Sequence, residues 1–367
     1  MVTVKYPIDF SCIYPLERLG KLTELLFFDI ETTGFSGDTS QLYLIGCVYH
    51  DGFGWKLIQW FADSPQGERE LLDAFFSFLS RFKTLVHFNG DGFDIPYLLK
   101  CCRRLGLPYT FDSIASVDIY KKIKPLKGLL GLENMKQKSI EQFLGVSRED
   151  RYTGGQLIEV YQDYLMTRQQ DLYDLLMLHN ADDLRGMPSI LPILSYSDMM
   201  DSPFILEECQ LLSPDGQQNS QEAFLHMVWK LSSQLPVSLE LSCGCEEALA
   251  SLELSGSSLI GNIPLYQGEL KYFYPNYKDY YYLPMEDTAI HKSVGEYVDR
   301  SARKKATART CYTRQSGLFL PQWEILWAPA LKREYGSHLS YALYEPDMLN
   351  PSCADAYARQ LLSHIVS

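Results

Sequence analysis

The sequence lacks the features that would place the protein in a membrane or outside the cell. No stretch of its 367 residues is an apolar run long enough to cross a bilayer, and the opening MVTVKYPIDFSCIYPLE does not have the pattern of a signal peptide. Its nine cysteines are scattered, which predicts free thiols rather than a disulfide framework. We therefore expect a protein of the reducing cytoplasm without a membrane partner.

The sequence also lacks an excess of positive charge. Its formal net charge is −13, and neither half of the chain is basic. Long-range electrostatics would not draw a polyanion to such a chain. A nucleic-acid partner would need local basic patches or bridging metal ions. With 46% hydrophobic and 22% charged residues, the composition is typical of a globular protein.

The pattern of elements predicts two domains, 1–200 and 222–367, joined by a linker or loop rich in Ser, Pro, Asp and Gln over about 200–221. In the first domain, hydrophobic runs predict strands that alternate with amphipathic helices, which indicates an α/β fold with helices covering a mixed sheet. The expected strands are 22–30, 41–50, 55–62 and 84–88, and the clearest expected helices are 68–82, 94–106 and 170–187, the last ending before Pro188. The tight turn DGFG predicts an antiparallel hairpin. Beyond 222, short strands and one helix over 285–305 predict a smaller α+β domain.

Two acids follow an apolar run in LLFFDIETTGF (25–35). Asp29 and Glu31 are two residues apart, so on a strand both side chains point to the same face. Taken alone, this pair is typical of a solvated strand end.

A third acid follows the strand predicted at 84–88. In HFNGDGFDIPYLL, Gly90 and Gly92 predict a sharp turn, and Asp94 stands where the next helix begins. Taken alone, Asp94 is interpreted as the N-cap of that helix.

A fourth acid lies in the helix predicted at 170–187. Leu172, Leu176, His179 and Asp183 are spaced so that they share one face, which the leucines mark as the face toward the core. An unpaired carboxylate is costly to bury there, so Asp183 is expected to have a cation or strong hydrogen bonds as partners. Asp182 is expected to be exposed.

Together these motifs predict a metal site. If the sheet brings the strands side by side, four carboxylates converge, and their mutual repulsion requires neutralising cations. Oxygen ligands favour Mg²⁺ or Mn²⁺. Two such ions roughly 4 Å apart can stabilise the attacking and leaving oxygens of a phosphoryl displacement.

FDIETTG, NGDGFDIPYL and HNADD resemble, in the same order, the three motifs of the DEDD (RNase H-like) 3′-to-5′ exonuclease superfamily, and most of all the bacterial YprB-type ribonuclease H-like proteins. The resemblance covers about 20–195. It implies an RNase H-like mixed five-stranded sheet flanked by helices. It also implies that Asp29, Glu31, Asp94 and Asp183 bind two Mg²⁺ or Mn²⁺ ions, and that the protein is a metal-dependent nuclease acting on DNA or RNA from a 3′ end.

One residue departs from the superfamily pattern. Members usually carry Tyr four residues before the last Asp or His five residues before it, whereas His179 stands four residues before Asp183. Imidazole can take a proton from water near neutral pH, so His179 is expected to act as the general base or to position the water. The alternative is a residue that hydrogen-bonds to a metal ligand.

Substrate contacts are expected near these motifs. Thr32, Asn89 and Phe93 are candidate residues of the substrate cleft, and Lys121 and Lys122 are candidate phosphate contacts within a lysine-rich segment, 119–138. Asp118 is expected to be a structural cap. A second basic segment, 300–314, and a tyrosine-rich one, 270–284, are further candidates for single-strand binding, although such tyrosines are more often part of a strand core.

Two other functions fit parts of the sequence. One is a nucleic-acid-binding or scaffold module with weak or no turnover on a nuclease fold, which the unusual His179 leaves open. The other is a haloacid dehalogenase-type phosphatase, since DIETT is one residue away from its D-x-D-x-T signature. That chemistry requires an aspartate where Glu31 stands and gives Asp94 no role.

Overall fold

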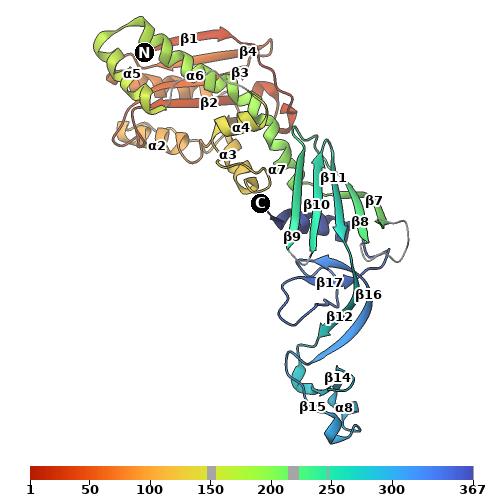
Figure 1. The fold of residues 1–367 in the computed structure, drawn as a ribbon. Coiled ribbons are helices and arrows are strands. Elements are labelled where there is room, and N and C mark those ends of the chain that lie inside the picture. The colour runs from red at the N-terminus through yellow and green to blue at the C-terminus, as the bar shows by residue number, and fades with distance from the viewer. Residues whose placement is uncertain (147–153, 214–222, 246–247, 367) are drawn as a thin grey trace. The chain divides into compact units, whose positions relative to one another are not determined.

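The chain divides into two compact units, Met1–Ser197 and Asp198–Ser367 (Figure 1). The computed structural model describes every residue except 147–153, 214–222, 246, 247 and 367. In the described part, no helix is long and apolar enough to span a membrane. All the acidic motifs lie in the first unit.

The first unit is built on a six-stranded sheet with the order β1-β4-β3-β2-β5-β6. Its strands are β1 (Val2–Pro7), β2 (Leu25–Thr32), β3 (Leu42–His50), β4 (Trp55–Phe61), β5 (Thr84–His87) and β6 (Ala115–Asp118). The predicted mixed α/β sheet is confirmed, and it contains one strand more than the five expected. Two edge strands, β1 and β6, were not located from the sequence; the alternating sequence VTVKYP of β1 pairs antiparallel with β4.

The sheet is mixed because its two halves are connected differently. β2, β3 and β4 are antiparallel neighbours, and β3 and β4 form the predicted hairpin, in which the Asp51 carboxylate accepts the N–H groups of Phe53 and Gly54 at 3.0 Å. β5 and β6 are parallel to β2, since helices connect these strands. The central strand β2 therefore ends beside the start of the helix that follows β5.

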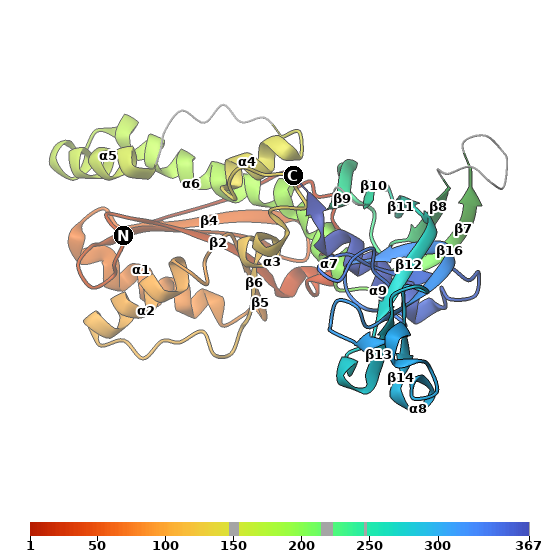
Figure 2. The ribbon, with the colours of Figure 1, turned by 60° about the horizontal axis from the view of Figure 1, so that its bottom comes forward.

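Helices cover both faces of the sheet (Figure 2). The larger ones are α1 (Glu68–Leu79), α2 (Asp94–Leu105), α5 (Gly154–Thr167) and α6 (Gln170–Ile190), and the shorter ones are α3 (Ile119–Ile123), α4 (Gln137–Phe143) and α7 (Leu194–Met200). Leu26, Phe28 and Ile30 of β2 pack in the same core cluster as residues of α1 and α2. Because side chains alternate along a strand, Asp29 and Glu31 point to the opposite face, which α6 covers.

The predicted end of the last long helix at residue 187 is wrong. α6 passes through Pro188 to Ile190, and a 3₁₀ turn (Leu191–Ile193) and α7 follow directly. A proline removes one hydrogen bond from a helix interior. Met187, Pro188 and Ile190 are all buried, so packing holds this segment helical despite the proline.

The second unit is mainly antiparallel β-structure. Its six-stranded sheet has the order β18-β9-β10-β11-β8-β7, and three-stranded sheets have the orders β12-β16-β17 and β14-β13-β15. These strands are β7 (Ile205–Leu212), β8 (Phe224–Lys230), β9 (Leu239–Cys245), β10 (Ala248–Ser255), β11 (Ser258–Pro264), β12 (Tyr266–Phe273), β13 (Tyr280–Leu283), β14 (Thr288–His291), β15 (Lys304–Lys305), β16 (Tyr312–Gln322), β17 (Ser340–Leu343) and β18 (Ile365–Val366). The helix α9 (Pro351–Ser363) accepts a hydrogen bond from Trp229 of β8 through the Ala354 carbonyl, at 3.1 Å. A smaller α+β region is therefore confirmed.

Two sequence predictions for this region are wrong. The segment taken as a linker contains β7, which pairs along its length with β8; the end of that segment lies outside the described residues. The helix predicted at 285–305 is replaced by β14, the four-residue helix α8 (Lys292–Gly295), a 3₁₀ turn (Arg300–Ala302) and β15. Pairing of β13 with both β14 and β15 overrides the local helical pattern.

Candidate active site

Asp29 and Glu31 lie near the end of the central strand, on the face covered by α6. Asp29 is paired with Gly46 of β3 and Glu31 with Leu44, and the register shifts between Glu31 and Thr32. Gly46 and Leu44, the residues of β3 that pair with these two acids, are both buried. The interpretation of a solvated strand end is therefore wrong: the Glu31 side chain keeps only 12% of its exposure.

Asp94 is the first residue of α2. The interpretation of Asp94 as the N-cap, which its position in the sequence favoured, is therefore wrong. The N-cap residue is Phe93, which makes no capping hydrogen bond through its side chain. Asp94 is 6% exposed, and its carboxyl group accepts the backbone N–H groups of Asp94 and Ile30. The bond from Ile30 places the Asp94 carboxyl at the end of β2, between the positions of Asp29 and Glu31.

His179 and Asp183 reach the same place from α6. The His179 Nε2 atom lies 3.4 Å from Asp183 Oδ2 and 3.8 Å from Glu31 Oε1. One ligand atom from each of these three residues lies within 4.8 Å of the others. Asp182 points away, is 47% exposed at its side chain and pairs with Arg185 at 3.3 Å, as expected for a solvated neighbour.

Burial raises the pKa values of three of the four acids. Burial raises the pKa of Asp29 well above its usual value, and the charges of the other three carboxylates raise it further. Burial is also the main cause of the raised pKa of Glu31, followed by the charges of Asp183 and Asp94. Burial raises the pKa of Asp94 to about 7. Like charges held this way in the fold favour a bound cation or a bound proton.

The donor atoms fit a divalent metal ion. The four acids offer only carboxylate oxygens, which are the ligands that Mg²⁺ and Mn²⁺ prefer. Asp29 and Glu31 are on a strand in the middle of a sheet, and Asp183 is on a long helix, so the ligands are carried by well-packed elements. These four carboxylates are called the acidic cluster below.

Two residues that support the acidic cluster were missed from the sequence. Asn180 is fully buried, and its Nδ2 donates to Asp29 Oδ2 at 3.0 Å. Its Oδ1 accepts from Nε2 of the buried Gln59 at 3.0 Å, and the same Gln59 nitrogen donates to the Met177 carbonyl at 2.9 Å. Gln59 thus fixes the orientation of the Asn180 amide, and Asn180 fixes one oxygen of Asp29. A single glutamine in the apolar strand WKLIQWF was the available signal.

Gly46 allows α6 to lie close to the sheet. A Cβ atom at this position would stand 2.0 Å from Asn180 Oδ1 and 2.5 Å from Leu184 Cδ1. Hydrogen bonds from Gln59 and to Asp29 hold the Asn180 side chain, so it cannot move away from an added Cβ atom without breaking them. A side chain at position 46 would therefore push α6, with His179 and Asp183, away from β2.

Gly46→Ala is accordingly expected to destabilise the protein by about 1 to 3 kcal/mol and to lower activity at this site at least about tenfold. Urea unfolding and a turnover assay measure the two effects. Gly54→Ala is the matched control, because a Cβ atom there meets nothing within 4 Å. Equal behaviour of the two variants would show that the close packing of α6 does not matter.

The residues predicted to contact substrate lie in different environments. Thr32 donates through Oγ1 to the Gly34 carbonyl at 2.8 Å, and Phe93 packs at the edge of the core against Tyr97, with ring centroids 5.7 Å apart. Asn89 is exposed and has a φ of 62°, a left-handed conformation that asparagine tolerates. Lys121 Nζ pairs with Asp91 at 2.9 Å, and Lys122 is exposed.

A second group of potential ligands, His87, Asp91 and Asp118, is occupied by internal hydrogen bonds. His87 Nδ1 accepts the N–H of Gly90 at 3.0 Å, so Nε2 carries the proton and faces Ser116 Oγ at 2.8 Å. Asp118 is the N-cap of α3, as expected, and accepts from the Lys121 N–H at 3.1 Å. Burial lowers the pKa of His87, which favours the neutral imidazole. The group holds the loop before Asp94 in shape.

The tyrosine-rich and basic segments of the second unit form part of its small sheets. Tyr281 lies between two cations, with Arg303 4.5 Å and Lys292 5.8 Å from its ring centroid. Tyr274 and Tyr280 stack at 4.6 Å. Several of these tyrosines therefore have structural contacts, in line with the strand-core interpretation.

Comparison with known proteins agrees with this geometry. Residues 26–195 match the family model RNase_H_2, described as RNase_H superfamily. The similarity of this part of the chain to the RNase H superfamily, which the motifs indicated, is confirmed. A haloacid dehalogenase-type phosphatase has no support from this match.

The curated relatives are DNA polymerases that are similar over a short region. The chain is 33% identical over 117 residues to a DNA polymerase of Thermococcus sp. (strain 9oN-7), which covers 29% of this chain and 15% of the relative. It is 33% identical over 112 residues to the DNA polymerase of Pyrococcus glycovorans, and this match covers 28% of this chain and 14% of that polymerase. The chain thus spans about 15% of the length of these relatives. The solved structure of the family B DNA polymerase from Pyrobaculum calidifontis has 17% sequence identity to this chain and a TM-score of 0.39. The match covers 67% of this chain and 33% of the polymerase chain.

Proposed function

We propose that this protein is a metal-dependent nuclease that hydrolyses phosphodiester bonds of DNA or RNA, acting from the 3′ end. The observation that carries the proposal is the acidic cluster, in which three separate parts of the chain bring carboxylates together inside an RNase H-like domain. The partial similarity to DNA polymerases, and the resemblance of the three motifs to those of DEDD exonucleases, support a nucleic-acid substrate and the 3′-to-5′ direction. The scattered cysteines favour the cytoplasm as its location.

In this proposal Asp29, Glu31, Asp94 and Asp183 hold two Mg²⁺ or Mn²⁺ ions. Bound divalent ions neutralise charge on the phosphate and make a bound water more acidic. Asn180 keeps the Asp29 carboxylate in one orientation, and the backbone N–H groups at Asp94 do the same for its carboxyl. The protein's contribution is thus a preorganised set of oxygen ligands on rigid elements.

His179 lies where it can take a proton. Its Nε2 faces the cluster, between Glu31 and Asp183, and a neutral imidazole accepts a proton from an attacking water at that atom. The same geometry also allows His179 to act through the Asp183 carboxylate as a positioning residue. The first role is proposed here because the ring nitrogen is turned toward the space between the carboxylates.

The test incubates the full chain with 5′-labelled and 3′-labelled DNA and RNA in Mg²⁺, Mn²⁺ or EDTA. Stepwise shortening of the 5′-labelled strand in the presence of metal is the expected result. Asp183→Asn should remove the activity, and Asp182→Asn, which changes the exposed neighbouring carboxylate, should keep it. Metal-independent cleavage, or equal products from both variants, would overturn the proposal, and binding without any cleavage would favour a nucleic-acid-binding module.

A further inference from the structure

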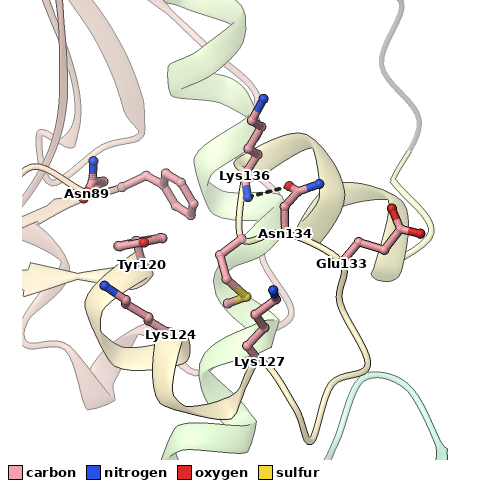
Figure 3. A pocket seen from close by; sticks show the side chains of 9 residues that line it. Asn89, Tyr120, Lys124, Lys127, Glu133, Asn134 and Lys136 are labelled. Carbon is pink, nitrogen blue, oxygen red and sulfur yellow. Dashed lines mark hydrogen bonds between the residues drawn. The ribbon is translucent and has the colours of Figure 1, made fainter. Parts of the chain in front are cut away.

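A pocket of about 430 Å³ opens in the first unit beside the loop that leads to Asp94 (Figure 3). Its walls come from the end of β5, from α3 and the turn after it, and from the segment before α4. The lining residues include Phe88, Asn89, Tyr120, Lys124, Lys127 and Lys136. We call this site the Tyr120 pocket.

One side of the Tyr120 pocket is aromatic. The rings of Phe88 and Tyr120 meet edge to face, with centroids 5.9 Å apart and an angle of 68° between the planes. Both residues are half-buried, so part of each ring lines the pocket, and the buried Met135 completes the apolar surface. A half-exposed aromatic ring is a surface on which a nucleobase stacks.

The other side carries positive charge. Lys124, Lys127 and Lys136 are all exposed, and Glu133 is the one acid among the lining residues. The Lys124 ammonium lies 5.5 Å from the centroid of the Tyr120 ring, so a cation and an aromatic face are presented together. In the described part of the chain no carboxylate forms an ion pair with these three lysines. On a protein with a net charge of −13, this is a local site for an anion such as a phosphate.

The wall before α4 is held in place by its own hydrogen bonds. The Asn134 Oδ1 atom accepts from the Lys136 N–H at 3.0 Å and from Ser139 Oγ at 2.7 Å. These bonds fix the backbone where α4 begins (Figure 3). The pocket is therefore formed before a ligand arrives, which lowers the cost of binding.

A single carboxylate links the Tyr120 pocket to the acidic cluster. Asp118 accepts the backbone N–H groups of Asn89 at 3.0 Å and Asp91 at 3.1 Å, and it also caps the helix that bears Tyr120. The loop that carries Asp94 and the aromatic wall are thus fixed by the same group.

We propose that the Tyr120 pocket binds an unpaired nucleotide of a single-stranded nucleic acid. The base stacks on Tyr120 and Phe88, and Lys124, Lys127 and Lys136 contact the phosphates. A paired base inside a duplex presents only its edges, so the pocket selects unpaired strands. The proposal rests on the proposed function, since it places the pocket next to the site of hydrolysis. DNA and RNA share the chemistry that the pocket recognises.

Binding is tested by fluorescence anisotropy of the full chain in EDTA, with labelled single strands of DNA and of RNA of about 12 nucleotides and with the matching duplex. Tyr120→Ala should weaken single-strand binding about 5- to 100-fold, and Tyr120→Phe, which keeps the ring, should bind like the wild type. Phe53→Ala, at a ring that is 99% exposed in the β3–β4 turn, is the aromatic control and should have no effect. If Tyr120→Ala and Phe53→Ala bind equally, or if the wild type prefers the duplex, the proposal is wrong.

The lysines are tested by the salt dependence of the same binding. The double variant Lys124→Glu and Lys127→Glu changes only exposed side chains, so it should fold normally. It should reduce the slope of log Kd against log salt by about 1 to 1.5, as expected for the loss of two contacts to a single strand. Lys138→Glu, an exposed lysine of α4 outside the pocket, is the control. Equal slopes for the double variant and Lys138→Glu would overturn the proposal that Lys124 and Lys127 contact phosphates.

Failure of the pocket and failure of the proposed function give different results. A small chromogenic diester without a nucleobase or sugar, bis(p-nitrophenyl) phosphate, tests hydrolysis at the acidic cluster without a nucleotide for the pocket to bind. Tyr120→Ala should hydrolyse it at the wild-type rate and show a raised KM only for oligonucleotides. If the wild type cleaves neither substrate, the proposed function fails; if Tyr120→Ala has wild-type KM values on oligonucleotides, only the pocket fails.

Discussion

Asp94→Asn should remove nuclease activity and at the same time stabilise the protein when metal is absent. We expect turnover to fall at least about a hundredfold, because the proposed metal site would lose one of its charged ligands. The shift of the Asp94 pKa from 3.8 to about 7 corresponds to about 4 kcal/mol between its two protonation states. Asparagine stays neutral, so the free energy of unfolding in EDTA at pH 8 should rise by about 1 to 4 kcal/mol.

The effect has a defined dependence on pH. The folded metal-free protein keeps the Asp94 proton up to about pH 7, whereas the unfolded chain releases it near pH 4. The folded state therefore binds more protons between these values, and the free energy of unfolding falls as the pH rises through this range. Below about pH 4 both states are protonated, so this group no longer makes the stability depend on pH and the stability it affects is fully present.

Urea unfolding in EDTA at pH 5 and pH 8 measures this difference. The wild type should lose stability between the two pH values, and Asp94→Asn should lose less, while Asp182→Asn should follow the wild type. Saturating Mn²⁺ should restore the stability of the wild type at pH 8 and have a smaller effect on Asp94→Asn. An equal loss of stability in the wild type and Asp94→Asn would contradict a repulsive acidic cluster.

His179→Gln is the second change with a large expected effect. If His179 accepts the proton from water, kcat should fall about a hundredfold or more, because glutamine cannot take up a proton. The metal concentration for half-maximal activity should stay within about threefold, since the four carboxylates are unchanged. His179→Tyr should recover part of the activity, because tyrosine is the usual residue at this spacing in the superfamily that the motifs resemble.

The positioning role predicts the opposite pattern. If His179 only orients Asp183, glutamine should retain most of kcat, and the loss should appear in the metal concentration that half-saturates the enzyme. Metal titrations of the turnover rate separate the two outcomes. His50→Gln, at the end of β3, controls for general effects of replacing a histidine in this unit.

The acidic cluster could be predicted from sequence because its members lie in short motifs with clear periodicity. Asp29 and Glu31 follow the period of a strand, and His179 and Asp183 follow that of a helix. The local sequence was therefore enough to predict which of these side chains share a face. The role of Asp94 was ambiguous, because a helix start also explains an aspartate. The hydrogen bond from the backbone N–H of Ile30, on a different element, places the Asp94 carboxyl at the end of β2, and no local pattern contains that information.

Other features depend on contacts between distant segments and were not predictable. Gln59, Asn180 and Gly46 support the acidic cluster through contacts that exist only after α6 lies on the sheet. The helix expected at 285–305 was replaced by strands because β13 pairs with both sides of that segment. The continuation of α6 past Pro188 likewise reflects burial, which outweighs the local preference of proline.

The link between Asp29 and Asn180 has a consequence for folding. The two residues are 151 positions apart in the chain, and Gln59 and Asn180 are 121 apart. Closing such long loops is entropically costly, and contacts of this kind form slowly. Docking of α6 is therefore what adds Asp183 and the Asn180 hydrogen bond to the other three carboxylates. A growing chain that has not yet reached α6 carries Asp29, Glu31 and Asp94 but lacks Asn180, His179 and Asp183, so the proposed metal site is complete only with the last long helix of the domain.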